Sequence, residues 1–342
     1  MEKPKDRDFI ETVEGLLFCV VGYLHPPDWY TAYLKYIPSW EGRWSREETR
    51  YDRVLPYYHV SQVEKTYDYL LKRHPQYIYR CPVRNITISS IPRKYVKAYY
   101  HPRDRLQSML AEGPRDRLEQ KLEGLAYLMA DLSGLETGDL GVTGSLLTGN
   151  HNPKFSDMDI TVYGQRASRK LKESILEARE KSDEILPLSK EKKMEWSRSR
   201  AERFPLKFEE LMELAEKRWN YGTYEGVYFS IHPTRVDQEI EETYGDYKYR
   251  QVCRIEGEAG IKDASEAIYL PAKYCLDSVG TETKMDVTIE EIVSFEGLFG
   301  DAFEAGDRIR FRGTLEHVTG LRAFHRVIVG GAGSRLDFIK RI

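Results

Sequence analysis

The sequence has few cysteines and no long apolar segment. It contains four cysteines, Cys19, Cys81, Cys253 and Cys275, and none of them belongs to a CxxC pair. This spacing argues against a disulfide framework or a zinc ribbon and favours free thiols in a reducing compartment, so we expect a cytoplasmic protein. No apolar run reaches 18 residues and the first residues lack the apolar core of a signal peptide, so we expect no membrane span.

An excess of one charge is also missing, as are internal repeats and low-complexity tracts. Lysine and arginine number 52 against 55 aspartates and glutamates, which gives a formal net charge of -3. The overall charge therefore provides no general attraction to nucleic acid, and any such binding must depend on local patches. With 41% hydrophobic and 31% charged residues, the 342-residue chain is typical of a globular protein with two or three domains.

Hydrophobic patterns divide the chain into three segments and predict an α+β protein. Residues 1–102 form an N-terminal mixed α/β region, with a hairpin in residues 8–24, a strand in residues 31–38 and a helix in residues 62–73. Residues 103–246 contain helices that are interrupted at Gly113 and Pro114, followed by alternating strands and helices. Residues 247–342 contain short alternating segments separated by Gly, Asp and Thr, which predict a small antiparallel β-barrel or sandwich.

The stretch GVTGSLLTGNHNPKFSDMDITVYG in residues 141–164 carries the residues that suggest chemistry. A short strand ends at Gly144, which permits a tight turn, and Ser145 stands where a helix can begin. Backbone N–H groups and a hydroxyl at such a turn suit a phosphate. Further on, Asp157 and Asp159 occupy alternate positions of a predicted strand, so their side chains point to the same face. Two carboxylates on one face repel unless a cation lies between them, and Mg²⁺ prefers such oxygen ligands.

Two familiar loop motifs fit this stretch poorly. A phosphate-binding P-loop requires Lys and Ser or Thr where Asn150 and His151 stand, and an EF-hand loop requires a closing Glu that is missing here. The remaining alternative is a surface strand end with two solvated aspartates. The combination of the Gly-Ser turn, a second glycine and Ser156 before the aspartates favours a functional site over that alternative.

The combined motif resembles the DNA polymerase β-like nucleotidyltransferase superfamily over roughly residues 115–240. The matching residues are Gly144, Ser145, Gly149, Ser156, Asp157 and Asp159. The whole chain also resembles a group of predicted nucleotidyltransferases of undetermined function. The resemblance implies a nucleotidyltransferase core with a mixed sheet, a nucleoside triphosphate as substrate, and Mg²⁺ or Mn²⁺ as cofactor. It further implies that Gly144, Ser145, Gly149 and Ser156 bind the nucleotide and that Asp157 and Asp159 bind metal and take part in catalysis.

The sequence departs from the superfamily pattern at one position. The pattern expects a third carboxylate on a later strand, but the predicted strand GVYFSIHP contains neither Asp nor Glu. Glu225 and Asp237 flank this strand, and His232 lies within it, on the same predicted face as Tyr228 and Ser230. An imidazole can accept a proton near neutral pH, so these three residues are the candidate bases. A hydrogen-bonded structural histidine is the competing interpretation of His232.

Two basic stretches with interspersed aromatic residues are candidates for RNA contacts. One runs from Lys190 to Lys207 and includes Trp196; the other runs from Arg93 to Arg105 and includes three tyrosines. Cations and aromatic rings together suit a nucleic-acid backbone and its bases. A solvated helix face or a lattice of ion pairs explains either stretch equally well. His151, in the loop between the turn and the aspartates, is a further candidate for substrate contact.

Two hypotheses follow for the function. The first is an enzyme that moves a nucleoside monophosphate from a nucleoside triphosphate to a hydroxyl on RNA, protein or a small molecule. The second is a catalytically degenerate protein of the same fold that binds RNA or a nucleotide. The absent third carboxylate favours the second hypothesis. Retention of two like charges, Asp157 and Asp159, favours the first, because a site without function has no physical reason to keep them.

Overall fold

The computed structural model describes residues 3–55, 60–282, 287–331 and 336–342, and the chain folds into two compact units. The first unit comprises Met1–Pro56, Ser89–Ser189 and Trp219–Glu241. The second comprises Tyr57–Ile88, Lys190–Arg218 and Glu242–Ile342. Each unit is thus built from separate stretches of sequence. The predicted domains, by contrast, are the continuous ranges 1–102, 103–246 and 247–342, and this division remains a prediction.

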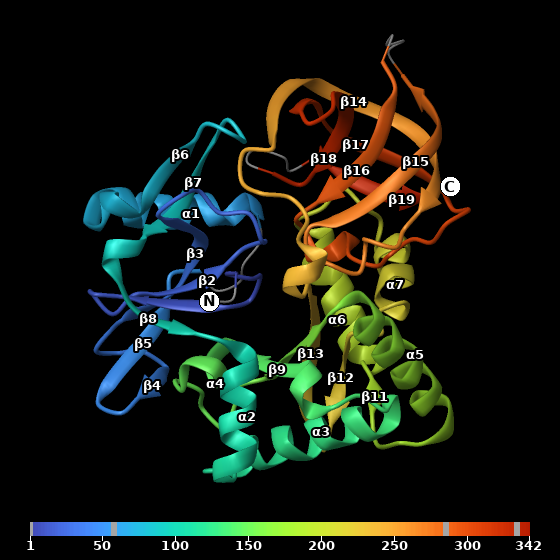
Figure 1. The fold of residues 1–342 in the computed structure, drawn as a ribbon. Helices are drawn as coiled ribbons and strands as arrows, with labels where there is room; N and C mark the ends of the chain where they lie inside the picture. Colours follow the sequence, from blue (N-terminus) through green and yellow to red (C-terminus); the bar gives the residue numbers. More distant parts are fainter. Residues whose placement is uncertain (1–2, 56–59, 283–286, 332–335) are drawn as a thin grey trace. The chain divides into compact units, whose positions relative to one another are not determined.

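The N-terminal part of the first unit is an antiparallel sheet (Figure 1). Its strands lie in the order β4-β5-β3-β2-β1-β8, and β7 pairs with β3. The boundary of the unit falls within β7, so β6, which pairs with β7, is counted in the second unit. Their bounds are β1 (Phe9–Thr12), β2 (Leu17–Val20), β3 (Trp29–Pro38), β4 (Trp44–Arg46), β5 (Thr49–Arg53), β6 (Ile78–Cys81), β7 (Ile86–Pro92) and β8 (Val96–Tyr100). The β1–β2 hairpin turns at Gly15, whose φ of +79° suits glycine, as the sequence predicts.

The second sheet of this unit is mixed and carries the motif region. Its strand order is β11-β12-β13-β10-β9, in which β10 runs parallel to β13 and the other neighbours are antiparallel. The bounds are β9 (Leu140–Thr143), β10 (Met158–Tyr163), β11 (Leu186–Pro187), β12 (Tyr221–Tyr224) and β13 (Val227–Thr234). The helices of this unit are α2 (Pro102–Glu112), α3 (Arg117–Ser133), α4 (Gly144–Thr148) and α5 (Gln165–Lys181).

Local sequence explains where α2 and α3 begin and end. Gly113, with φ of +83°, ends α2 at the predicted break. The Asp116 carboxylate accepts hydrogen bonds from the first backbone N–H groups of α3, and Gly134 ends that helix in the left-handed conformation. The apolar stripe of α3 is buried as its spacing predicts, and it consists of Leu118, Leu122, Leu125 and Met129.

The second unit contains a closed five-stranded barrel. The ring runs β14-β15-β16-β18-β17 and closes through pairing of β17 with β14, while β19 extends it from β17 (Figure 1). The bounds are β14 (Tyr247–Asp263), β15 (Ala272–Thr281), β16 (Ile289–Ser294), β17 (Arg308–Gly320), β18 (Phe324–Val329) and β19 (Phe338–Arg341). The predicted C-terminal barrel is confirmed, but it is not wholly antiparallel. Directions cannot alternate fully around an odd-numbered ring, and β16 and β18 run parallel.

Besides the barrel, this unit contains the helices α1 (Val60–Arg73), α6 (Lys190–Ala201) and α7 (Phe208–Glu216). Leu211 and Leu214 of α7 join the core formed by inward-facing strand residues such as Phe311 and Val327. The α+β class is therefore confirmed. Among the described residues, no helix is long and apolar enough to cross a membrane. All four cysteines are free thiols.

Candidate active site

The turn after β9 lies directly beside Asp159. In the antiparallel pairing of β9 and β10, Asp159 stands opposite Thr143, the residue before Gly144. Gly144 begins α4 with φ of +69°, and a Cβ at this position would lie 2.5 Å from Asp159 Oδ2. Glycine is therefore required both by the backbone conformation and by the space that the carboxylate occupies. The predicted turn and one predicted aspartate come together.

Asp159 belongs to a short hydrogen-bonded chain on β10 and β13. Ser230 stands opposite Asp159 in the parallel pairing, and its hydroxyl donates to Asp159 Oδ1. Ser230 Oγ lies 2.8 Å from His232 Nε2, which is 3.8 Å from Asp159 Oδ1. A hydroxyl has one proton, and Ser230 gives it to Asp159, so Nε2 of His232 donates to Ser230. Ser230 thus occupies the strand position opposite Asp159 where a carboxylate would complete an acidic cluster.

The environment shifts the pKa values of both titratable groups in this chain. Burial alone would raise the pKa of Asp159, but the contacts with His232 and Ser230 and the charge of Lys35 outweigh it and hold this pKa below its usual range. Burial, reinforced by the positive charge of Arg7, lowers the pKa of His232 to about 4. At neutral pH the site therefore contains an ionised Asp159 and an uncharged imidazole.

A cavity of about 180 Å³ opens beside these residues and is lined by both sheets of the first unit. The mixed sheet and its turn contribute Thr143, Gly144, Asp159, Tyr221, Tyr228, Ser230 and His232. The N-terminal sheet and the segment before it contribute Arg7, Phe9, Cys19 and Lys35. None of these four N-terminal residues is predicted from the sequence. The one feature of the sequence that could have pointed to Lys35 is its charge within the largely apolar and aromatic run TAYLKYIP.

Three other residues of the motif, Ser145, Gly149 and Ser156, lie in α4 and in the loop that follows it. Ser145 is buried in the first turn of α4, and Gly149 ends that helix with φ of +69° while its N–H donates to the Ser145 carbonyl. Ser156 Oγ accepts a hydrogen bond of 2.9 Å from the Asn152 N–H and so closes the loop before β10. Asp157 is exposed and immediately precedes β10. Asp159 is thus the aspartate that lines the cavity. Asp157, which the sequence predicts within the same strand, lies one residue before β10 instead.

Of the three candidate bases, His232 is the one in the cavity. Glu225 is exposed in the turn between β12 and β13, where its carbonyl accepts from Lys121. Asp237 forms an ion pair of 2.7 Å with Lys5. Neither Glu225 nor Asp237 lines the cavity, because each lies beyond an end of β13 rather than along it. Alternation of side chains along β13 places Ser230 and His232 on one face. The sequence pattern therefore already separated His232 from Glu225 and Asp237.

His151 and Arg105 hold the segments next to the cavity. His151 Nε2 lies 2.8 Å from Asp116 Oδ2, which ties the loop after α4 to the first turn of α3. Arg105 bonds to the Leu146 carbonyl of α4 at 3.2 Å and pairs with Glu119 at 2.8 Å. Both side chains therefore fix the position of α4 and its loop.

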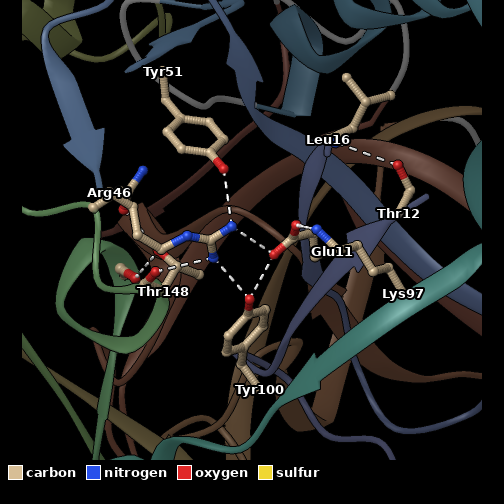
Figure 2. A network of polar contacts seen from close by, with 10 residues as sticks. Glu11, Thr12, Leu16, Arg46, Tyr51, Lys97, Tyr100 and Thr148 are labelled. Carbon is tan, nitrogen blue, oxygen red and sulfur yellow. Dashed lines mark hydrogen bonds and ion pairs between the residues drawn. The ribbon is translucent and has the colours of Figure 1, made fainter. Parts of the chain in front are cut away.

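An ionic network around the buried Glu11 connects the N-terminal sheet to α4. Figure 2 shows that the Glu11 carboxylate accepts hydrogen bonds from Arg46, Lys97 and Tyr100. The ion pairs with Arg46 and Lys97 are each 2.8 Å long. Arg46 also donates to the carbonyl of Thr148 at the end of α4, where the helix dipole favours a cation. Only 3% of the Glu11 side chain is exposed. The network therefore fixes α4 against the sheet that supplies Lys35.

Many cations of the two basic stretches already have partners within the protein. Between Arg93 and Arg105, Lys97 pairs with Glu11, while Arg103 lies 4.3 Å from the centre of the Tyr163 ring. Between Lys190 and Lys207, Lys193 pairs with Glu216, and Arg200 stacks 3.8 Å from the centre of the half-buried Trp196 ring. Part of each stretch is thus an internal ion-pair and stacking arrangement.

Comparisons with known proteins agree with this geometry. Residues 125–221 match the family described as Nucleotidyltransferase domain, a range that includes α4, β10 and the aspartates. The chain is also 30% identical over 334 residues to the uncharacterized protein MJ1086 of Methanocaldococcus jannaschii, and the alignment covers 96% of each chain. The chain belongs to the DNA polymerase β-like nucleotidyltransferase superfamily. No solved structure matches it.

The nucleotidyltransferase domain supports a general nucleotidyltransferase activity. The matched range begins within α3 and ends at Tyr221, so it contains Gly144 and Asp159 but neither Ser230 nor His232. Arg7 and Lys35, which line the same cavity, also lie outside it. The likeness to the archaeal relative extends over 96% of the chain, far beyond the range that the family matches.

Proposed function

We propose that this protein moves a nucleoside monophosphate from a nucleoside triphosphate to a hydroxyl acceptor, with Mg²⁺ or Mn²⁺ as its cofactor. The observation that carries the proposal is the close approach of Gly144 and Asp159 within one cavity. A backbone turn that suits phosphate and a carboxylate that suits a hard cation are thereby adjacent. In the reaction, a bond forms between the acceptor oxygen and the α-phosphorus, and pyrophosphate leaves.

The donor set fits one divalent ion better than two. Mg²⁺ is usually held by one or two carboxylates together with substrate phosphates, and Asp157 and Asp159 can supply those carboxylates. Among the described residues, no cluster of three or more His, Cys, Asp or Glu side chains could hold a metal ion. Asp159 Oδ1 already accepts from Ser230, while Oδ2 faces Gly144. A bound ion would neutralise phosphate charge and lower the cost of deprotonating the acceptor hydroxyl.

His232 is the proposed proton acceptor of this chain. Its imidazole is uncharged at neutral pH, and its Nε2 donates to Ser230, so Nδ1 is the ring atom with an available lone pair. Its low pKa makes it a weaker base than an ordinary histidine, so we expect a low rate of nucleotidyl transfer. Ser230 and Asp159 hold the ring in this tautomer. Glu225 and Asp237 lie outside the cavity and take no part in this proposal.

A second candidate function is supported by Ser230. Because this residue stands where a third carboxylate would face Asp159, the protein can alternatively bind a nucleotide or RNA without transferring any group. In either case, an RNA partner would contact cations of the stretches from Arg93 to Arg105 and from Lys190 to Lys207. The acceptor of the transferase can be RNA, a protein or a small molecule.

A label-transfer assay separates the two functions. The full chain is incubated with each α-labelled nucleoside triphosphate, Mg²⁺ or Mn²⁺, and mixed RNA or the protein itself as acceptor. We expect metal-dependent transfer that Asp159→Asn abolishes and His232→Gln reduces, with Glu225→Gln as a matched control that keeps full transfer. RNA binding with steep salt dependence and no transfer under any condition would replace the enzyme with the binding protein.

A further inference from the structure

The connectivity of the barrel in the second unit narrows the kind of ligand to consider. Counted along the chain, the ring runs 1-2-3-5-4 and closes onto strand 1, with strands 3 and 5 parallel. This is the connectivity of the OB-fold, a five-stranded Greek-key barrel that binds oligonucleotides or oligosaccharides, partly through the connection between strands 4 and 5. Here that connection is the β17–β18 hairpin. Because a fold alone does not establish a ligand, its side chains must supply the chemistry.

A row of polar side chains crosses the hairpin and the neighbouring β14. Arg250 of β14 stands opposite His317 of β17, and His317 stands opposite His325 of β18. Directly opposite residues share a face, so the three side chains lie on one face of this three-stranded sheet. Lys248 and Thr319, two residues farther along, form the next pair on that face. These five residues are called the open face below.

The two faces of this sheet differ in burial. On the opposite face, Val318 is fully buried and Glu316 is 6% exposed. On the open face, Lys248, Arg250 and Thr319 are exposed, while the two imidazoles are partly exposed. The sheet is therefore packed on one side and available to a partner on the other.

The open face carries positive charge that the protein does not neutralise. Within the described part of the chain, Lys248 and Arg250 form no ion pair. The negative charge that acts on His325 is that of Glu290, which pairs with Arg322 at 2.6 Å. Such a face attracts a polyanion rather than a neutral oligosaccharide, and it disfavours a metal ion at the imidazoles.

The two imidazoles supply a stacking surface beside these cations. The rings of His317 and His325 are stacked, with centroids 4.8 Å apart and planes inclined by 22°. Burial, reinforced by the charges of His317 and Arg250, lowers the pKa of His325, so its ring is uncharged at neutral pH. Unpaired nucleobases stack on histidine rings and on arginine guanidinium planes.

We propose that the open face binds single-stranded nucleic acid, with Lys248 and Arg250 at the phosphates and a base stacked on the imidazole pair. The strand is single because the bases of a duplex are stacked on one another and closed to protein rings. The site lies in the second unit, outside both basic stretches, and does not depend on the proposed transferase activity.

Fluorescence anisotropy of the full chain with labelled oligouridine tests the cations. The probe has about 12 nucleotides, within the roughly 4–16 that one OB-fold covers, and the buffer contains EDTA and no nucleoside triphosphate. We expect Arg250→Ala and Lys248→Ala to weaken binding, by about tenfold for Arg250→Ala, and to lower the salt slope by about 0.7 each. Lys262→Ala is the matched control, because Lys262 is an exposed lysine of β14 outside the open face.

The imidazole pair is tested by its own variants. His325→Ala removes one stacking ring, so we expect about fivefold weaker binding with an unchanged salt slope. His325→Phe keeps a ring at the same position and should retain most of the affinity. Circular dichroism confirms that each variant is folded.

Several outcomes would overturn the assignment. These are no binding by the wild type, equal affinities of wild type and Arg250→Ala, or an equal loss in Lys262→Ala. Oligothymidine of the same length identifies the nucleic acid: a similar, Arg250-dependent affinity supports contacts to phosphate and base alone, and a much weaker one supports RNA. Because the assay contains neither metal nor nucleoside triphosphate, its failure leaves the transferase standing, and failure of label transfer leaves this site standing.

Discussion

Gly144 and Asp159 are so close that an added methyl group on the glycine would lie 2.5 Å from the carboxylate oxygen Oδ2. The contact joins the end of one strand to its neighbour, because Thr143 and Asp159 face each other across β9 and β10. It therefore places backbone N–H groups and a carboxylate at one edge of the cavity. The proposed chemistry depends on this proximity.

Substituting Gly144 tests that contact. Gly144→Ala must displace Asp159 in addition to adopting a positive φ, so we expect a loss of about 2–4 kcal/mol in the free energy of unfolding and loss of nucleotide binding. Gly226→Ala is the control, because Gly226 also has a positive φ of +76° but nothing lies within 4 Å of an added Cβ. Urea unfolding and calorimetry measure the two effects. Equal losses in both variants would show that the close approach to Asp159 has no consequence.

The Glu11 network should make stability depend on pH at acidic values. Burial opposes ionisation, but hydrogen bonds from Lys97, Tyr100 and Arg46 lower the pKa of Glu11 below 4.5. Its stabilising contribution is therefore present above that pH and is lost as the pH falls through the lower folded-state pKa. We expect Glu11→Gln to cost about 3 kcal/mol at pH 7 and less at pH 3, measured by urea unfolding.

Glu173→Gln serves as the control for this variant, since Glu173 lies on the surface of α5 and is not buried. It should change the free energy of unfolding by no more than about 0.5 kcal/mol at either pH. If Glu11→Gln behaved like Glu173→Gln, the network would contribute nothing to the attachment of α4.

His232 should contribute a second pH dependence at higher pH. Its ordinary pKa of 6.5 falls to about 4 in the folded protein, through burial and the charge of Arg7. Between these values the unfolded chain binds a proton that the folded chain does not, so stability decreases as the pH falls from 6.5 to 4, by about 3 kcal/mol in all. The free-energy difference between wild type and His232→Gln should shrink over this window. A difference independent of pH, measured by urea unfolding, would contradict the buried neutral imidazole.

Local patterns predicted the Gly144 turn and the strand of Asp159, although Asp157, expected within that strand, lies just before it. A strand period of two and a glycine turn placed Gly144 next to the strand of Asp159, and the structure has both within residues 140–163. The same reasoning placed Ser230 and His232 on one strand face. It did not supply their register against β10, because pairing between strands about 70 residues apart depends on tertiary packing.

The N-terminal half of the cavity could not be predicted in this way. Lys35 alternates with the buried Leu34 and Tyr36 along β3, but which cavity that face lines depends on how the sheet packs against distant parts of the chain. The left-handed backbone of Arg7 has no reliable signature in one sequence. The parallel pair β16–β18 was missed for a related reason. Alternating segments indicate strands, but only closure of a five-membered ring requires one pair to be parallel.

A crystal structure of the full chain with a non-hydrolysable nucleoside triphosphate analogue and Mn²⁺ tests the central claim most directly. The account predicts an anomalous peak for one Mn²⁺ at the Asp159 carboxylate, and phosphate groups that contact the Gly144 turn. Phosphates bound elsewhere, with the cavity between Gly144 and Lys35 free of nucleotide and metal, would contradict it.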